Sequence, residues 1–73
     1  MYRKPVKSTN IAAIGYDPDD RILEVEFTTK RGNPVYAYRG VTEEEHEDLI
    51  FAPSIGKYFA EHIKPKYTGE LVS

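Results

Sequence analysis

Two tyrosines stand one residue apart in the run Val35-Tyr36-Ala37-Tyr38-Arg39, a spacing that could present two aromatic rings to a ligand. Alternate residues of a β-strand point to the same face, so Tyr36 and Tyr38 share a face if this run is a strand. Proteins that bind single-stranded RNA stack bases on such rings, gaining about 1–3 kcal/mol per base. The alternative, which we favour for so small a domain, is that both rings lie under covering helices and form the core.

Lysines and arginines near both ends of the sequence are candidates for contacts with a nucleic-acid backbone. If the two ends meet in the fold, these basic side chains would form one surface that faces phosphates. Arg39 directly follows the second tyrosine and could meet a phosphate beside a stacked base. The predicted nucleic-acid-binding residues are Arg3, Lys4, Lys7, Arg39, Lys57, Lys64 and Lys66.

The charge balance of the chain favours a second hypothesis about its partner. Ten lysines and arginines stand against twelve acids, giving a net charge of −2, whereas a dedicated nucleic-acid binder usually has a basic excess. The acids are concentrated in Glu43, Glu44, Glu45, Glu47 and Asp48. This acidic run and the unpaired edges of a small sheet indicate the alternative, a protein-interaction or assembly module that binds another protein or itself without nucleic acid.

The run Ser54-Ile55-Gly56-Lys57 could bind an anion at the start of a helix. The first backbone amides of a helix are free, glycine lets a phosphate approach, and Lys57 adds positive charge. The predicted anion-binding residues are therefore Ser54, Gly56 and Lys57. The run is far shorter than a Walker loop, and the alternative is an ordinary helix cap in which Gly56 serves tight packing.

The remaining polar residues predict neither catalysis nor a bound metal or cofactor. The chain has two histidines, His46 and His62, and no cysteine, so a closed zinc site would need carboxylates to complete it. The acidic turn at residues 17–20 lacks the glycine and distant glutamate of a calcium loop. We find no nucleophile, base and orienting acid at a recognisable spacing, so the sequence predicts a non-catalytic binding domain.

Three strand-like runs must position these residues. Residues 22–28 alternate apolar and polar side chains, with Leu23, Val25 and Phe27 on one face, as in an antiparallel sheet covered on one side. Residues 11–16 and 35–39 flank this run and are separated from it by short polar loops. The three runs predict an antiparallel meander.

Two short helices are predicted to follow the meander. Thr42 with Glu45 forms a capping box for a helix that reaches about Phe51, and Pro53 ends it. A second helix, capped by Ser54, would run to the region before Pro65. The predicted fold class is α+β, a three-stranded antiparallel meander followed by two short helices packed on one face.

The totals indicate one domain, spanning residues 1–73, with a loose arm at residues 1–8 and a tail at 68–73. No apolar run approaches the roughly 20 residues that span a bilayer, and the basic first residues lack the apolar core of a signal peptide. The absence of cysteine suits a reducing compartment, so we expect a cytoplasmic protein with no membrane partner.

Five short motifs follow one another along the chain: Ser8-Thr9-Asn10-Ile11, Ile14-Gly15-Tyr16-Asp17, Leu23-Glu24-Val25-Glu26-Phe27, Tyr36-Ala37-Tyr38 and Ala52-Pro53-Ser54-Ile55-Gly56-Lys57-Tyr58-Phe59. In this order and spacing they resemble the KTSC domain, a family named after the C-terminal domain of some lysyl-tRNA synthetases. The resemblance covers about residues 6–67 and is closer to the small stand-alone bacterial and phage members.

RNA binding is the function proposed for that family, so the resemblance implies RNA or tRNA as a partner. Two positions depart from the family pattern. His46 stands where a bulky apolar or aromatic residue is expected, and Ala60 stands where the family tends to have asparagine. A ligand contact made by that asparagine would be missing here.

Overall fold

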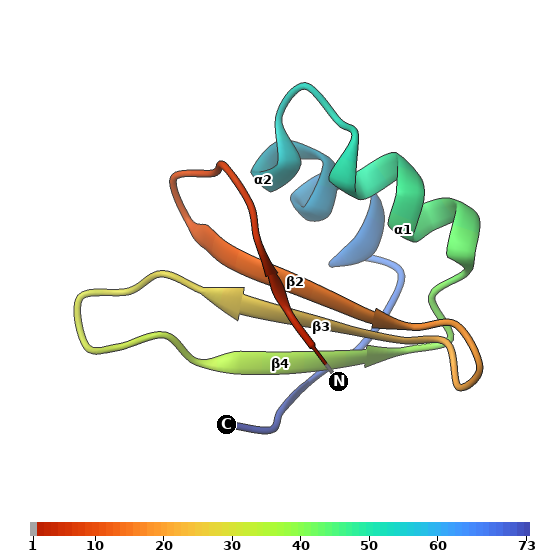
Figure 1. The fold of residues 1–73 in the computed structure, drawn as a ribbon, viewed down its shortest axis with the longest axis horizontal. Helices are drawn as coiled ribbons and strands as arrows, with labels where there is room; N and C mark the ends of the chain where they lie inside the picture. The colour runs from red at the N-terminus through yellow and green to blue at the C-terminus, as the bar shows by residue number, and fades with distance from the viewer. Residues whose placement is uncertain (1) are drawn as a thin grey trace.

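The chain folds into a sheet layer and a helix layer in the computed structural model, which describes residues 2–73 (Figure 1). The sheet is antiparallel with the strand order β1-β2-β3-β4-β5, and the helices cover one of its faces. The strands are β1 (Lys4–Pro5), β2 (Ile11–Asp17), β3 (Ile22–Phe27), β4 (Val35–Arg39) and β5 (Gly69–Leu71). The helices are α1 (Glu43–Ile50), α2 (Ile55–Tyr58) and the π-helix η1 (Phe59–Ile63).

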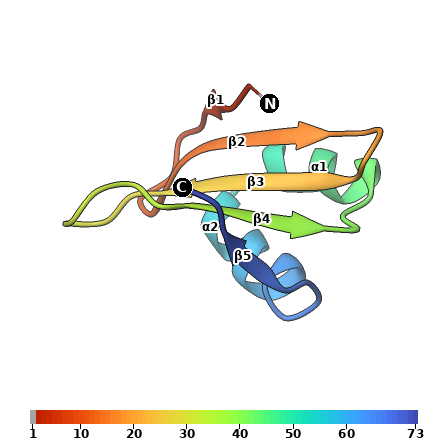
Figure 2. The same cartoon turned by 90° about the horizontal axis from the view of Figure 1, so that it is seen from below.

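The α+β class and the central meander are confirmed, but the prediction of three strands is wrong. The sheet has five strands because each end of the chain pairs with an outer strand of the meander (Figure 2). Lys4 of β1, in the predicted arm, lies opposite Ile14 of β2, and Glu70 of β5, in the predicted tail, lies opposite Ala37 of β4. Strands of two and three residues are too short to show alternation, so only pairing with a formed sheet defines them.

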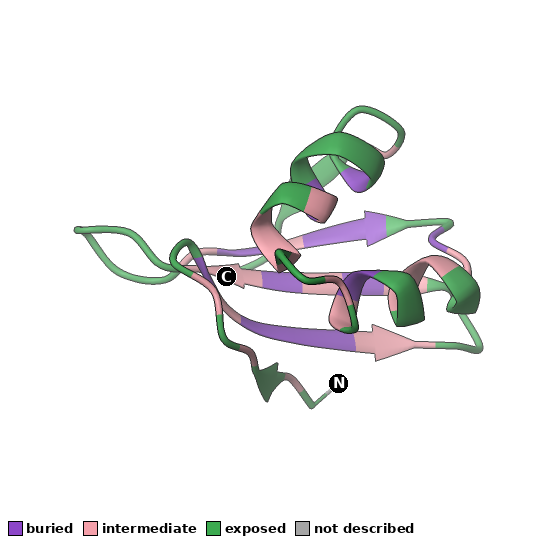
Figure 3. Cartoon of the chain, turned by 90° about the horizontal axis from the view of Figure 1, so that it is seen from above, coloured by how far each residue is buried: buried purple, intermediate pink, exposed green. Residues whose placement is uncertain are grey.

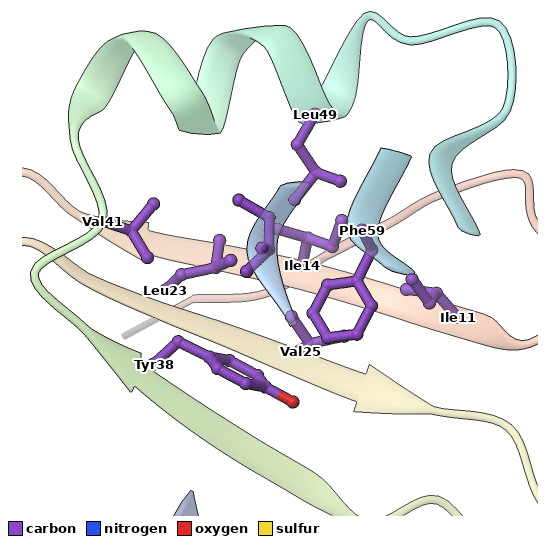
Figure 4. Packing of buried hydrophobic residues seen from close by; sticks show 9 residues of the cluster. Ile11, Ile14, Leu23, Val25, Tyr38, Val41, Leu49 and Phe59 are labelled. Carbon is purple, nitrogen blue, oxygen red and sulfur yellow. The ribbon is translucent and has the colours of Figure 1, made fainter. Parts of the chain in front are cut away.

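The apolar core lies between the sheet and the helices (Figure 4). Leu23 and Val25 of β3 are fully buried and face the helices, as their alternation predicts. They belong to one cluster with Leu49 of α1 and with Phe59 and Ile63 of η1. The buried segments of the strands accordingly lie beneath the helices (Figure 3). Burying a side chain of this size contributes about 1.5–3 kcal/mol, so this seam holds the two layers together.

The opposite face of the sheet is closed by an ion-pair cluster rather than left to water. Arg3, which precedes β1, donates to Glu24 Oε1 at 2.8 Å and to Glu26 Oε1 at 3.3 Å. The same cluster extends to Asn33, whose Nδ2 donates to Glu26 Oε2 at 3.1 Å. Ala37 lies between β3 and β5 on this face and is buried. The arm of the chain therefore contributes Arg3 to the face of the sheet that the helices leave uncovered.

The start of α1 is fixed by a hydrogen-bond network centred on Glu45, called here the Glu45 network. The predicted capping box is present: Glu45 N donates to Thr42 Oγ1 at 3.1 Å, and Thr42 N donates to Glu45 Oε1 at 3.0 Å. Lys66 Nζ donates to Glu45 Oε2 at 2.8 Å, and the Tyr67 hydroxyl donates to Oε1. Burial acts to raise the pKa of Glu45, but the hydrogen bonds from Lys66, Tyr67 and Thr42 outweigh burial and lower the pKa to about 2.

The second predicted helix is two short helices of different geometry. Ser54 caps α2, which continues into the π-helix η1, where Lys64 N donates to Phe59 O at 2.9 Å, five residues back. Phe59 and Ile63, the first and last residues of η1, are both buried in the core. π-helical turns are rare and are found frequently at functional sites, so the surface beside η1 is a candidate functional site.

Candidate nucleic-acid interface

A hollow of about 350 Å³ lies between the covered face of the sheet and the start of η1. Aromatic side chains from β3, β4 and η1 form much of its wall, and we call it the aromatic hollow. It is lined by Asn10, Phe27, Tyr36, Tyr38, Gly56, Phe59, Ala60 and Lys64. Because it combines rings, an amide and one ammonium group, it offers stacking, hydrogen-bonding and ionic contacts in one place.

A second hollow of about 390 Å³ adjoins the first and carries two of the predicted lysines. We call it the lysine hollow, and it lies between the segment before β2 and the start of α2. It is lined by Lys7, Ser8, Thr9, Asn10, Pro53, Ser54, Ile55, Gly56 and Lys57. Asn10 and Gly56 line both hollows, so the aromatic and basic surfaces are continuous.

A close contact between Asn10 and Gly56 forms the junction of the two hollows. Ser8 Oγ donates to Asn10 Oδ1 at 3.1 Å, which leaves the side-chain amide Nδ2 of Asn10 as a donor. A Cβ atom on Gly56 would lie 2.6 Å from Asn10 Oδ1, so any larger residue there must displace the asparagine. Gly56 therefore serves close packing, as one alternative reading of the sequence held.

Ser54 acts as a helix cap in the predicted anion site. Its hydroxyl accepts from Lys57 N at 3.3 Å, which satisfies one of the free amides that an anion would have bound. The Lys57 side chain is mostly exposed, and its Nζ lies 4.0 Å from Glu61 Oε1. The geometry thus gives Ser54 a structural role and leaves Lys57 as the charged group facing the lysine hollow.

The two tyrosines differ in how far they are buried. Tyr38 is only 6% exposed and packs edge-on against Phe59, with ring centroids 5.3 Å apart, so its core assignment is confirmed. Burial raises the pKa of Tyr38, and the neighbouring Tyr36 raises it further. Tyr36 is half-buried and packs edge-on against half-buried Phe27 at 5.7 Å. Part of these two rings is therefore accessible from the aromatic hollow.

The seven predicted basic contacts fall into separate places. The two hollows bring together Lys7, Lys57 and Lys64. Arg3 is held by carboxylates on the opposite face of the sheet, and Lys66 is held by Glu45. The other two lie away from both hollows: Arg39 at the far end of β4, 3.9 Å from Glu70, and Lys4 on β1.

Sequence reasoning did not identify four of the lining residues as site residues: Asn10, Phe27, Phe59 and Ala60. Phe27 was predicted, with Leu23 and Val25, to lie on the covered face of its strand. Asn10 stands in the motif Ser8-Thr9-Asn10-Ile11, and Ala60 stands at a departure from the family pattern. Both signals were therefore present in the sequence, but neither pointed to a contact between strand and helix.

Within residues 2–73 the structure offers neither a metal site nor a membrane span. No three histidine, cysteine, aspartate or glutamate side chains in this region are grouped so that they could hold a metal ion. No helix in the same region is long and apolar enough to cross a bilayer.

The five-stranded antiparallel sheet, covered on one face by the short helices α1, α2 and η1, defines the class, a small α+β domain. The family model described as the KTSC domain matches residues 7–67, and the chain belongs to this family. The fold is similar to the crystal structure of a KTSC domain protein from Yersinia pestis, with 40% identity and a TM-score of 0.88. That match covers 99% of this chain and 97% of the other.

Two bacterial relatives match over most of their length. An uncharacterized protein of Stutzerimonas stutzeri strain A1501 is 36% identical over 67 residues, which are 92% of this chain and 90% of the relative. A protein of Tsukamurella paurometabola is 39% identical over 64 residues, 88% of this chain and 91% of the relative.

Proposed function

We propose that the protein is a non-catalytic, cytoplasmic domain that binds single-stranded RNA across the aromatic and lysine hollows. The observation that carries the proposal is their junction at Asn10 and Gly56, which joins an aromatic wall to three lysines. Single-strand binders combine these two elements: rings that stack bases and positive charge that follows the backbone.

The aromatic hollow has room for one base. Tyr36 and Phe27 are half-buried, so each can offer part of a ring, while Tyr38 and Phe59 support them from the core. Stacking tolerates any base, and the free Nδ2 of Asn10 adds a hydrogen-bond donor at the mouth. A duplex keeps its bases stacked inside, so the proposal favours unpaired RNA.

The three lysines place positive charge on both sides of the stacked base. Lys64 lies at the end of η1 beside the aromatic hollow, and Lys7 and Lys57 line the lysine hollow. Three phosphate contacts on a single strand predict a salt dependence with a slope of about −2 in log K against log salt. The net charge of −2 does not oppose this site, because much of the acidic charge lies on α1.

The test is a titration with an unpaired RNA octamer and with the duplex that this octamer forms with its complementary strand, followed by amide chemical shifts at low salt. The octamer is expected to bind saturably and to shift Asn10, Tyr36 and Gly56. Replacing Lys7, Lys57 and Lys64 together by glutamine should weaken binding at least tenfold.

The matched control is Arg39→Gln, which removes a positive charge from the far end of β4. This variant should bind the octamer within twofold of the parent chain. The proposal fails if no saturable shift appears at about 50 mM salt, or if Arg39→Gln weakens binding as much as the triple variant.

A further inference from the structure

A separate cleft of about 580 Å³ lies between α1 and the strands β1 and β2, and it shares no lining residue with the two hollows. Its wall combines aromatic rings with carboxylates from the first turns of α1. The residues that matter are Tyr2, Lys4, Tyr16, Glu43, His46 and Glu47. The proposed RNA site uses none of them.

A stacked pair of rings forms one wall of the cleft. The rings of Tyr16 and His46 lie 4.5 Å apart with an interplanar angle of 10°. The Tyr16 hydroxyl donates to Val41 O at 2.5 Å, which fixes the position of the pair. Burial lowers the pKa of His46 more than Glu47 and Glu43 raise it, which favours the neutral imidazole. A neutral histidine fills the aromatic position expected there and does not repel a cation.

The charges around the cleft favour a positively charged occupant. Glu43 and Glu47 are exposed, and neither lies within 4.0 Å of a basic side chain among residues 2–73. Among residues 2–73, Lys4 is the only lysine or arginine in the lining, so two carboxylates and one ammonium group line the cleft. Tyr2 also lines the cleft and is 76% exposed.

We propose that this cleft binds an arginine side chain from an extended segment of a partner protein. A guanidinium group is planar, so it can stack on an aromatic wall while its donors pair with carboxylates. The exposed acids Glu44 and Asp48 continue the negative charge along α1 beyond the cleft. That continuation fits a basic peptide better than a small isolated cation, because further basic residues of the segment would meet it.

The test uses capped pentapeptides with the sequence Gly-Ser-X-Ser-Gly, in which X is arginine, citrulline or leucine. Amide and side-chain shifts of Tyr16 and His46 report occupancy of the cleft. The arginine peptide should bind at least fivefold more tightly than the other two, because citrulline keeps the shape without the charge. Equal binding of all three peptides, or no shift with any of them, overturns the proposal.

Variants of the cleft give effects of opposite sign. Glu43→Gln with Glu47→Gln should weaken the arginine peptide about tenfold, whereas Lys4→Gln should strengthen it about twofold by removing a like charge. The matched control, Glu44→Gln with Asp48→Asn, also removes two negative charges, from exposed positions of α1 that do not line the cleft. If this control weakens binding as much as the double variant, the attraction is general to α1 and the cleft is not the site.

The RNA proposal and this one can fail separately. The variant lacking Lys7, Lys57 and Lys64 changes no residue of the cleft, so it should bind the arginine peptide as tightly as the parent chain does. A twofold or larger change would mean that the peptide binds elsewhere.

Discussion

Both α-helices begin with a hydroxyl cap, but the start of α1 is held by further side chains whereas the start of α2 is accessible. Thr42 begins α1 inside the Glu45 network, in which one carboxylate accepts from its own cap, from Lys66 and from Tyr67. Ser54 begins α2 with a single longer bond, from Lys57 N at 3.3 Å, beside the junction of the two hollows. The first helix start is closed by partners from the end of the chain, and the second is left accessible.

The difference separates the two roles in this small domain: the start of α1 contributes to stability, and the start of α2 belongs to the proposed binding site. A chain of this size buries only about 60% of its extended surface, so polar anchors outside the core carry weight. The Glu45 network ties the segment after η1 to α1 and thereby supports the approach to β5. The start of α2 makes few such contacts, which leaves its polar groups available to a ligand.

The largest effect on stability is expected from Glu45→Gln, which disrupts the Glu45 network at the start of α1. The Glu45 side chain is only 18% exposed, and the change removes the charge that Lys66 and Tyr67 donate to. The free energy of unfolding should fall by about 2 kcal/mol, measured by urea denaturation at pH 7. Glu44→Gln, an exposed neighbour in the same turn, should change the unfolding free energy by less than about 0.5 kcal/mol. Equal losses in both variants would mean that the network does not anchor the helix.

Acid should remove the same contribution from the unmodified chain. The pKa of Glu45 is lowered to about 2 from its ordinary value of 4.5, so folding favours the charged carboxylate. Its contribution, about 2 kcal/mol after screening, is complete above pH 4.5 and is lost as the pH falls toward 2. Urea denaturation of the parent chain and of Glu45→Gln at pH 7, 4.5, 3 and 2 should give unfolding curves that converge on acidification. A constant gap between the two would refute the assignment.

A substitution at the start of α2 should change the affinity for RNA rather than the free energy of unfolding. In Gly56→Ala, the new Cβ would meet Asn10 Oδ1 at 2.6 Å and displace the side chain at the junction. Alanine is favoured over glycine in a helix by about 1 kcal/mol, which should offset the displacement and leave the unfolding free energy nearly unchanged. RNA affinity, measured by fluorescence anisotropy with the unpaired octamer, should fall about fivefold. If Gly56→Ala instead lowers the unfolding free energy and leaves RNA affinity unchanged, the start of α2 serves stability and not binding.

The sequence determines one of these helix starts more fully than the other. Thr42 and Glu45 lie three residues apart, so the capping box can be identified locally. The partners Lys66 and Tyr67 lie about 20 residues further on, and only the folded chain brings them to Glu45. The second start depends on a contact between Asn10 and Gly56, which no local pattern contains.

The same distinction applies to the sheet. β3 was predictable because Leu23 and Val25 alternate with glutamates over a full strand. The residues of β1 and β5 are all exposed and show no alternation, so their strand character comes from the neighbours they pair with. The two edge strands therefore could not be predicted from local sequence.

The smallest expected effect is a gain of contact in the aromatic hollow. Ala60 lines this hollow at the position where the family tends to have asparagine. An amide there adds a donor and an acceptor near the proposed base, so Ala60→Asn should raise affinity for the unpaired octamer about twofold to threefold. Ala60→Leu, larger and apolar, should lower it by filling the hollow. Anisotropy titrations of both variants decide the matter: if asparagine and leucine weaken binding equally, the position requires only a small residue and reads nothing of the ligand.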